Sequence, residues 1–102
     1  MVQYQIVDRT FAALADPTRR AVVERLGTGS ATISELAQPF GITLTGMRKH
    51  VRILEEAKLV RTEKVGRARR CSLVPQPLAH IEAWFKRLDR FEELLERRKG
   101  EA

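Results

Sequence analysis

The sequence predicts a mainly α-helical fold with a small β-hairpin, comprising five helices and two strands. Three observations predict it: apolar residues recur at helical spacing in five segments, the spacing becomes strand-like between residues 60 and 74, and glycines, prolines and capping residues separate the segments. The chain has 102 residues, enough for one small domain. No linker, internal repeat or low-complexity stretch divides it. We therefore expect a single domain over residues 1–102.

The first two predicted helices meet at an Asp-Pro pair. The first covers about residues 6–15, where three apolar residues follow i, i+4, i+7 spacing: Val7, Phe11 and Leu14. Asp16 can accept hydrogen bonds at the N-terminus of the next helix. Pro17 suits the first turn of that helix because no amide donor is needed there. The second helix therefore runs from this pair to about Leu26.

A short third helix precedes a tight turn and a longer fourth helix. We expect the third over about residues 35–40, with Ser34 as its N-cap. Gly41 supplies the turn. Thr43 then caps a fourth helix over about residues 44–57.

After residue 59 the pattern becomes extended. Residues 60–65 lose the helical spacing and predict one extended run, residues 69–74 form a second, and Gly-Arg-Ala at 66–68 predicts the tip of a hairpin. Pro75 and Pro77 end this hairpin and open a last helix over about residues 78–99. This order predicts a winged helix-turn-helix, with the wing at about 60–74 and one additional helix at each end.

The fourth helix has two distinct faces. Four apolar residues form its expected buried stripe: Leu44, Met47, Val51 and Leu54. Four polar residues at i, i+3, i+4, i+7 suit contacts with DNA bases and phosphates: Thr45, Arg48, Lys49 and Arg52. Gly46 would let the start of the helix approach DNA closely, and Thr43 could hold a phosphate. An ordinary amphipathic surface helix remains the alternative.

The excess positive charge is concentrated around this helix and the hairpin. The chain has a net charge of +6, and residues 43–70 alone contain nine basic and three acidic residues. Near the hairpin tip, Lys64, Arg67, Arg69 and Arg70 suit the sugar–phosphate backbone. We therefore expect double-stranded DNA to be the partner, although a solvated basic surface would have the same composition.

Three segments of the sequence resemble a known family. Phe-Ala-Ala-Leu-Ala-Asp-Pro-Thr-Arg-Arg at 11–20, Ile-Ser-Glu-Leu-Ala at 33–37, and Arg-Lys-His-Val-Arg-Ile-Leu-Glu-Glu-Ala at 48–57 are similar to segments of the bacterial ArsR/SmtB-type repressors. The resemblance covers nearly the whole chain. It implies a homodimer formed by the first and last helices, which binds an imperfect inverted repeat near its own promoter. Members often release DNA when an inducer binds, and the sequence does not identify one here.

The resemblance is closest to the metal-independent branch of that family. Metal-sensing members commonly have a Cys-x-Cys pattern near the position of Leu36, which this chain lacks. Its one cysteine, Cys71, and two histidines, His50 and His80, are too few for a tetrahedral site within one chain. We expect no metal and no cofactor. Two alternatives stay open: a metal site shared between subunits, and a redox response through Cys71, whose pKa nearby arginines could lower.

The last predicted helix has more apolar surface than a small core can cover. With the first helix it gives a predicted dimer interface: Val7, Phe11, Leu14, Ile81, Trp84, Leu88, Phe91 and Leu95. The alternative is that the helix folds back on its own domain.

These features together predict a cytoplasmic, sequence-specific repressor. No segment is long and apolar enough to cross a membrane, and the lone cysteine fits a reducing compartment. The sequence contains no phosphate-binding glycine loop and no evident nucleophile–base pair, so we do not expect an enzyme. A winged-helix module that binds proteins is the second class of function.

Overall fold

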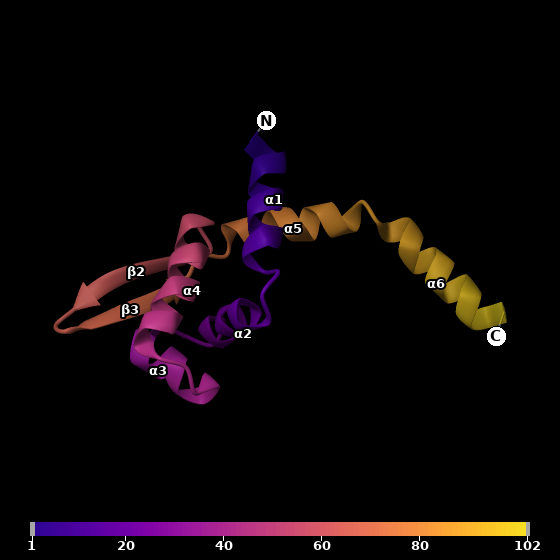
Figure 1. The fold of residues 1–102 in the computed structure, drawn as a ribbon. Helices are drawn as coiled ribbons and strands as arrows, with labels where there is room; N and C mark the ends of the chain where they lie inside the picture. Colours follow the sequence, from indigo (N-terminus) through magenta and orange to yellow (C-terminus); the bar gives the residue numbers. More distant parts are fainter. Residues whose placement is uncertain (1, 102) are drawn as a thin grey trace.

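The computed structural model describes residues 2–101, and the side chains of residues 5–98 among them. Within that part there are six α-helices and a small three-stranded sheet, whose hairpin projects from one side of the molecule while α6 extends away on the other (Figure 1). The elements in order are α1 (Val2–Ala13), α2 (Pro17–Leu26), β1 (Ala31–Thr32), α3 (Ile33–Ala37), a 3₁₀ turn (Gln38–Phe40), α4 (Leu44–Glu56), β2 (Val60–Val65), β3 (Ala68–Leu73), α5 (Gln76–Lys86) and α6 (Asp89–Glu101). None of the helices described combines the length and apolar character that crossing a membrane requires.

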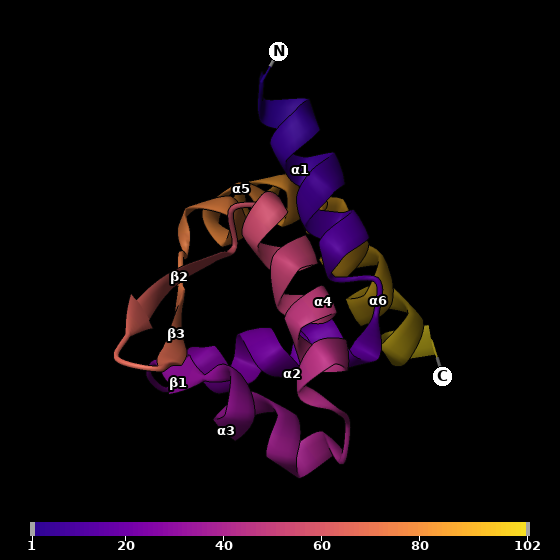
Figure 2. The same cartoon turned by 60° about the vertical axis from the view of Figure 1, so that its left-hand side comes forward.

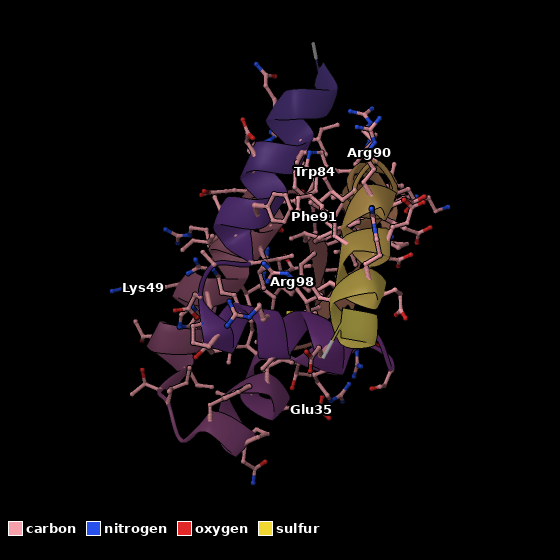
Figure 3. All side chains as sticks on the ribbon, turned by 90° about the vertical axis from the view of Figure 1, so that its right-hand side faces the viewer. Glu35, Lys49, Trp84, Arg90, Phe91 and Arg98 are labelled. Atoms are coloured by element: carbon pink, nitrogen blue, oxygen red, sulfur yellow. The ribbon has the colours of Figure 1, made fainter. Side chains whose placement is uncertain are left out.

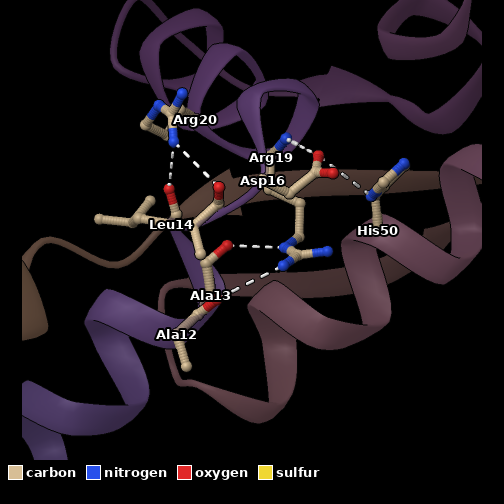
Figure 4. Close-up of polar contacts among 8 residues, drawn as sticks. Ala12, Ala13, Leu14, Asp16, Arg19, Arg20 and His50 are labelled. Carbon is tan, nitrogen blue, oxygen red and sulfur yellow. Dashed lines mark hydrogen bonds and ion pairs between the residues drawn. The ribbon is translucent and has the colours of Figure 1, made fainter.

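The junction between α1 and α2 is fixed by side chains that bind backbone groups (Figure 4). Asp16 caps α2, since its Oδ2 accepts a 3.1 Å hydrogen bond from the amide of Arg19. Arg19 Nε donates to the carbonyl of Ala13 at 2.6 Å, and Arg20 Nη1 donates to that of Leu14 at 2.8 Å. These bonds satisfy carbonyls that the end of α1 leaves unpaired. The Asp-Pro-Thr-Arg-Arg segment therefore holds one helix end and starts the next.

The start of α3 differs from the prediction. Thr32 is the N-cap, not Ser34: Thr32 Oγ1 accepts from the amide of Glu35 at 3.1 Å, and Glu35 Oε1 accepts from the amide of Thr32 at 2.9 Å. This capping box starts the helix two residues earlier than expected. The helix also ends earlier, at Ala37. The last three residues of the predicted helix, Gln38–Phe40, form a 3₁₀ turn that contains Pro39.

The sheet has three strands in the order β1-β3-β2, whereas we predicted only the two-stranded hairpin. In the strand that was missed, Ala31 pairs with Cys71 in antiparallel register. The strand β1 has only two residues, too few to show an alternation of apolar and polar side chains in the sequence. The hairpin is also tighter than predicted, since Val65 pairs with Ala68 and leaves a two-residue turn. Gly66 begins that turn at a φ of +62°, which glycine adopts without strain.

The core lies between α2, α3, α4 and the sheet (Figure 2). The predicted buried stripe of α4 is largely confirmed, because Met47, Val51 and Leu54 are buried. Leu44 is an exception with 44% of its surface exposed, since it lies in the first turn of α4 beyond the core. The largest fully buried side chains are Leu36, Met47, Leu54, Leu59, Val22, Thr10 and Cys71.

The predicted last helix is broken in two, which brings the helix count to six rather than five among the residues described. After α5 the amide of Leu88 bonds the carbonyl of Phe85 at 2.8 Å, in a tight final turn. Asp89 then opens α6, where an acidic residue suits the helix dipole. The sequence has neither glycine nor proline here, and its apolar spacing continues through the break. For that reason the pattern predicted one continuous helix.

Candidate nucleic-acid interface

The first turn of α4 is held by Thr43, as predicted. Its Oγ1 accepts a 3.0 Å hydrogen bond from the amide of Gly46. A Cβ added to Gly46 would lie 3.3 Å from that oxygen, so a larger residue would crowd the cap. Gly46 is half-buried, and its lack of a side chain leaves room for the hydroxyl of Thr43 that caps the helix. The hydroxyl proton of Thr43 and the start of α4 remain available to an anion.

The predicted polar face of α4 is exposed throughout. Thr45, Arg48, Lys49 and Arg52 are all solvent-accessible, and Figure 3 shows Lys49 pointing away from the body of the protein. Among the described side chains, none of the three cations lies within 4.0 Å of a carboxylate. Their charges are therefore free to meet an anionic partner.

The helix α4 and the wing line one groove, which we call the α4–wing groove. It has a volume of about 380 Å³. Arg48 contributes from α4, and Lys64, Arg67 and Arg69 contribute from the hairpin. Ser34, which we had assigned to capping, is an exposed hydroxyl in the same groove. Nothing in the sequence marked it as a site residue, because its position depends on where α3 begins.

A second hollow of about 330 Å³ continues beside this groove. Arg48, Arg52 and Arg69 line it together with Glu55 and Thr62. Thr62 Oγ1 donates a 2.8 Å hydrogen bond to Oε2 of Glu55. One oxygen of the Glu55 carboxylate therefore accepts a hydrogen bond from the wing. The guanidinium groups of Arg48, Arg52 and Arg69 border the hollow, which is basic overall.

Two basic residues near this surface are held by other residues of the chain. Arg70 is half-buried, and its Nη1 donates to Oγ of Ser30 at 3.1 Å. His50 is half-buried on α4, with Nδ1 3.8 Å from Oδ2 of Asp16. The first anchors the wing and the second packs α4 against α2, so neither belongs to the exposed basic face.

Cys71 is fully buried in the centre of the sheet, opposite Ala31 and Thr62. Burial raises the pKa of its thiol above the ordinary value, and the opposing effect of Arg69 is smaller. The expectation that nearby arginines lower this pKa is therefore wrong, because desolvation dominates. A protonated, buried thiol is a poor nucleophile.

The residues predicted for a dimer interface fall into two groups. Phe11 and Trp84 pack edge to face within one chain, with ring centroids 5.5 Å apart, and Leu14 packs against the core. The first helix and the first half of the predicted last helix thus contact each other inside the chain. Phe91 and Leu95 lie on α6 and are 58% and 59% exposed. The remaining predicted positions are half-buried: Val7, Ile81 and Leu88.

Sequence comparisons identify regulators as relatives. A family model described as a helix-turn-helix domain matches residues 14–63. The HTH-type transcriptional regulator Rv2034 of Mycobacterium tuberculosis is 38% identical over 91 residues, which cover 89% of this chain and 82% of that protein. The transcriptional repressor SdpR of Bacillus subtilis is 30% identical over 60 residues, covering 59% of this chain and 67% of the repressor.

Structural comparisons agree. The crystal structure of an ArsR family transcriptional regulator matches with a TM-score of 0.79 and 44% sequence identity. The match covers 87% of this chain and 92% of the regulator's chain. The solution structure of a homodimeric winged helix-turn-helix DNA-binding domain from Mycobacterium bovis has a TM-score of 0.68 at 21% identity. The match covers 85% of this chain and 81% of the Mycobacterium bovis chain. At 21% identity it shows a similarity of fold alone.

Proposed function

The chain belongs to the ArsR-type winged helix-turn-helix transcriptional regulators, and we propose that it is a homodimeric repressor that binds an inverted-repeat operator. One observation carries the proposal: exposed cations of α4 and of the hairpin line the same groove and make no ion pair with described carboxylates. Such a surface suits a polyanion with a regular shape.

Within this proposal, α4 is the recognition helix and enters the major groove. Arg48 and Arg52 can each offer two donors to a guanine, and Thr45 can contact a base or a thymine methyl group. Lys49 neutralises a phosphate, while Thr43 and the amides after it bind another at the start of the helix. Gly46 has no side chain and keeps that turn clear for the DNA backbone. These roles follow from exposure and donor chemistry.

The hairpin supplies sequence-independent affinity. Lys64, Arg67 and Arg69 are exposed, and two of them face each other in register, since Lys64 pairs with Arg69 across the strands. Long cations on a projecting hairpin suit phosphates that flank the major groove. Each phosphate contact releases counterions, so this part of the affinity should fall steeply with salt.

The homodimer is supported by an apolar stripe that a single chain leaves uncovered. Phe91, Leu94 and Leu95 follow i, i+3, i+4 spacing on α6, and each is about half exposed or more. In Figure 1, α6 projects away from the rest of the chain. A second copy would bury this stripe together with the exposed edges of Phe11 and Phe85. The Mycobacterium bovis protein, which shares the fold, is itself homodimeric.

We propose that the repressor works without a metal ion. Among the described side chains, no three His, Cys, Asp or Glu residues are grouped to hold one. The buried, protonated Cys71 is also unsuited to sensing oxidants. The two relatives of this chain named above are a transcriptional regulator and a transcriptional repressor, so we propose no enzymatic activity.

A salt series of gel shifts on genomic fragments tests the proposal. A DNA-binding repressor shows a preferred fragment and an affinity that falls steeply as salt rises. A module that binds proteins shows neither. If the protein retained no fragment even at low ionic strength, the proposal would be wrong.

A further inference from the structure

A pocket at the other end of α4 is not used by the proposed DNA surface. It has a volume of about 420 Å³ and lies between α1, the end of α4, the base of the hairpin and the start of α5. We call it the α1–α5 pocket. An α-helix rises about 1.5 Å per residue, so the 13 residues of α4 place this pocket about 20 Å from the turn at Thr43. Its volume lies within the range of small-molecule sites.

The lining of the pocket combines positive charge with apolar surface. Arg9, Lys58, Arg61 and His80 contribute basic side chains from four different elements or connections. Ile6 and Val74 contribute apolar surface. No acidic residue lines the pocket in the described part of the chain, and its three permanent cations make no ion pair there. Three like charges around one hollow repel each other, and an anion between them would relieve that repulsion.

The backbone at Lys58 is a second sign of a site. Lys58 has a φ of +64°, and it is the one residue other than glycine with a positive φ among those described. It follows the C-cap of α4, and the amide of Leu59 closes the turn on the carbonyl of Leu54 at 2.9 Å. Glycine is the residue that normally occupies this position because a side chain is strained there. A lysine at a strained position that lines a pocket points to a functional constraint on that charge.

We propose that the α1–α5 pocket binds a small organic acid, with its carboxylate among Arg9, Lys58 and Arg61 and its apolar body against Ile6 and Val74. The pocket contacts the recognition helix, the base of the wing and the two helices next to the proposed dimer surface. A ligand that binds one arrangement of these elements better than another shifts the population of DNA-binding conformations. This regulatory step rests on the proposed function, whereas ligand binding itself does not.

The pocket and the aromatic contact use different faces of α1. Ile6 and Arg9 line the pocket, while Phe11, which packs against Trp84, lies on the roughly opposite side of the helix at about 100° of rotation per residue. A ligand can therefore occupy the pocket without displacing the aromatic contact between α1 and α5.

A titration of the DNA-free 102-residue chain with sodium octanoate, followed by amide NMR, tests the binding. We expect saturable shifts centred on residues 57–61, about a threefold weaker affinity in either Arg9→Gln or Lys58→Gly, and about a tenfold weaker affinity in the double variant. Octanol lacks the charge and inorganic phosphate lacks the apolar body, so each should bind at least about tenfold more weakly. Lys86→Gln removes an exposed lysine outside the pocket and is the matched control.

The Lys58→Gly variant separates a ligand-binding role from a structural one. Glycine relieves the strain at φ +64°, so this variant should melt at a higher temperature while binding octanoate more weakly. Unchanged octanoate affinity in the double variant would overturn the proposal, as would equal binding of octanol or phosphate.

The regulatory step is measured separately, on operator DNA. At an octanoate concentration near the Kd of the unmodified protein, octanoate should change the affinity of that protein for DNA and should change that of the double variant much less. An unchanged affinity in both would contradict the regulatory step while leaving the binding result intact. Failure to bind any DNA would instead contradict the proposed function, and the NMR titration would still decide the pocket.

Discussion

The Nδ1 atom of His50 is buried and lies 3.8 Å from Oδ2 of Asp16 (Figure 4). This contact joins α4, the helix that we propose binds DNA, to the cap of α2. Nδ1 has no hydrogen-bond partner among the described residues. Asp16 is also held by the amide of Arg19, which is the largest of the effects that lower the pKa of its carboxyl group. The carboxylate of Asp16 thus caps α2 and approaches His50 of α4 at the same time.

Replacing Asp16 by asparagine should flatten the loss of stability in acid. The folded pKa of Asp16 lies below its ordinary value of 3.8, so its stabilising contribution is complete above that pH and is lost as pH falls through the lower folded value. Asparagine keeps a capping oxygen but does not titrate. Urea unfolding at about pH 5 and about pH 3, on either side of the ordinary carboxyl pKa, measures the difference. The unmodified protein should lose more stability than Asp16→Asn, and identical losses would contradict this.

The α1–α2 junction shows which part of the fold the sequence could predict. The Asp-Pro pair identified the helix boundary, because capping chemistry acts within a few residues of the chain. The paired arginines did not reveal their role, since Arg19 and Arg20 bond carbonyls of the preceding helix that only the folded turn brings near. The two-residue β1 strand was missed for a similar reason: its pairing with β3 is a tertiary contact that leaves no periodic pattern.

Removing Arg48 or Arg52 should weaken operator binding and leave the fold intact. Both side chains are exposed, so truncating them opens no cavity in the core. Removing the proposed hydrogen bonds to a base costs about 1–3 kcal/mol, roughly a fivefold to 150-fold decrease in affinity. Fluorescence anisotropy of Arg48→Ala and Arg52→Ala measures it, with Lys86→Ala as the exposed control. Unchanged operator affinity in both variants would exclude this face.

The hairpin variants should have a different signature. Lys64→Ala, Arg67→Ala and Arg69→Ala each remove a cation that we propose binds a phosphate, so specific and non-specific duplexes should be weakened to a similar degree. The slope of log affinity against log salt should become shallower by about one for each phosphate that is no longer neutralised. If the slope stayed constant while specificity fell, these residues would bind bases instead.

A charge on the apolar stripe of α6 should separate the subunits. Phe91→Glu and Leu95→Glu each place a carboxylate in the proposed interface, where an unpaired charge is costly. Since both positions are exposed in the single chain, the domain itself should stay folded. Sedimentation velocity and circular dichroism check this together, with Glu93→Lys on the opposite side of the helix as control. A dimer that persists in both variants would place the interface elsewhere.

The thiol of Cys71 should react slowly in the folded protein. It is fully buried, and burial raises the pKa of the group, so little thiolate exists at neutral pH. Reaction with a chromogenic disulfide should therefore be slow in buffer and fast in denaturant. DNA affinity after mild peroxide treatment should match that of a Cys71→Ala variant. A rapid reaction in buffer, accompanied by a decrease in DNA binding, would restore the redox alternative.

The candidate DNA surface was more predictable than the last helix. The four polar residues of α4 lie on one face because helical spacing alone decides it, and all four are exposed. The groove that joins Arg48 to the wing could not be predicted, because its width depends on how the hairpin packs against α3 and α4. The break at Leu88 was also hidden, since the apolar spacing runs through it unchanged.

Selection of duplexes from a random pool by the purified protein tests the central claim most directly, because it reports sequence preference and symmetry together. Two identical recognition helices on a symmetric dimer predict an enriched inverted repeat whose half-site centres are about 10–10.5 base pairs apart, or a multiple of that distance. Enrichment of a single unrepeated site, or no enrichment at low salt, would contradict the account.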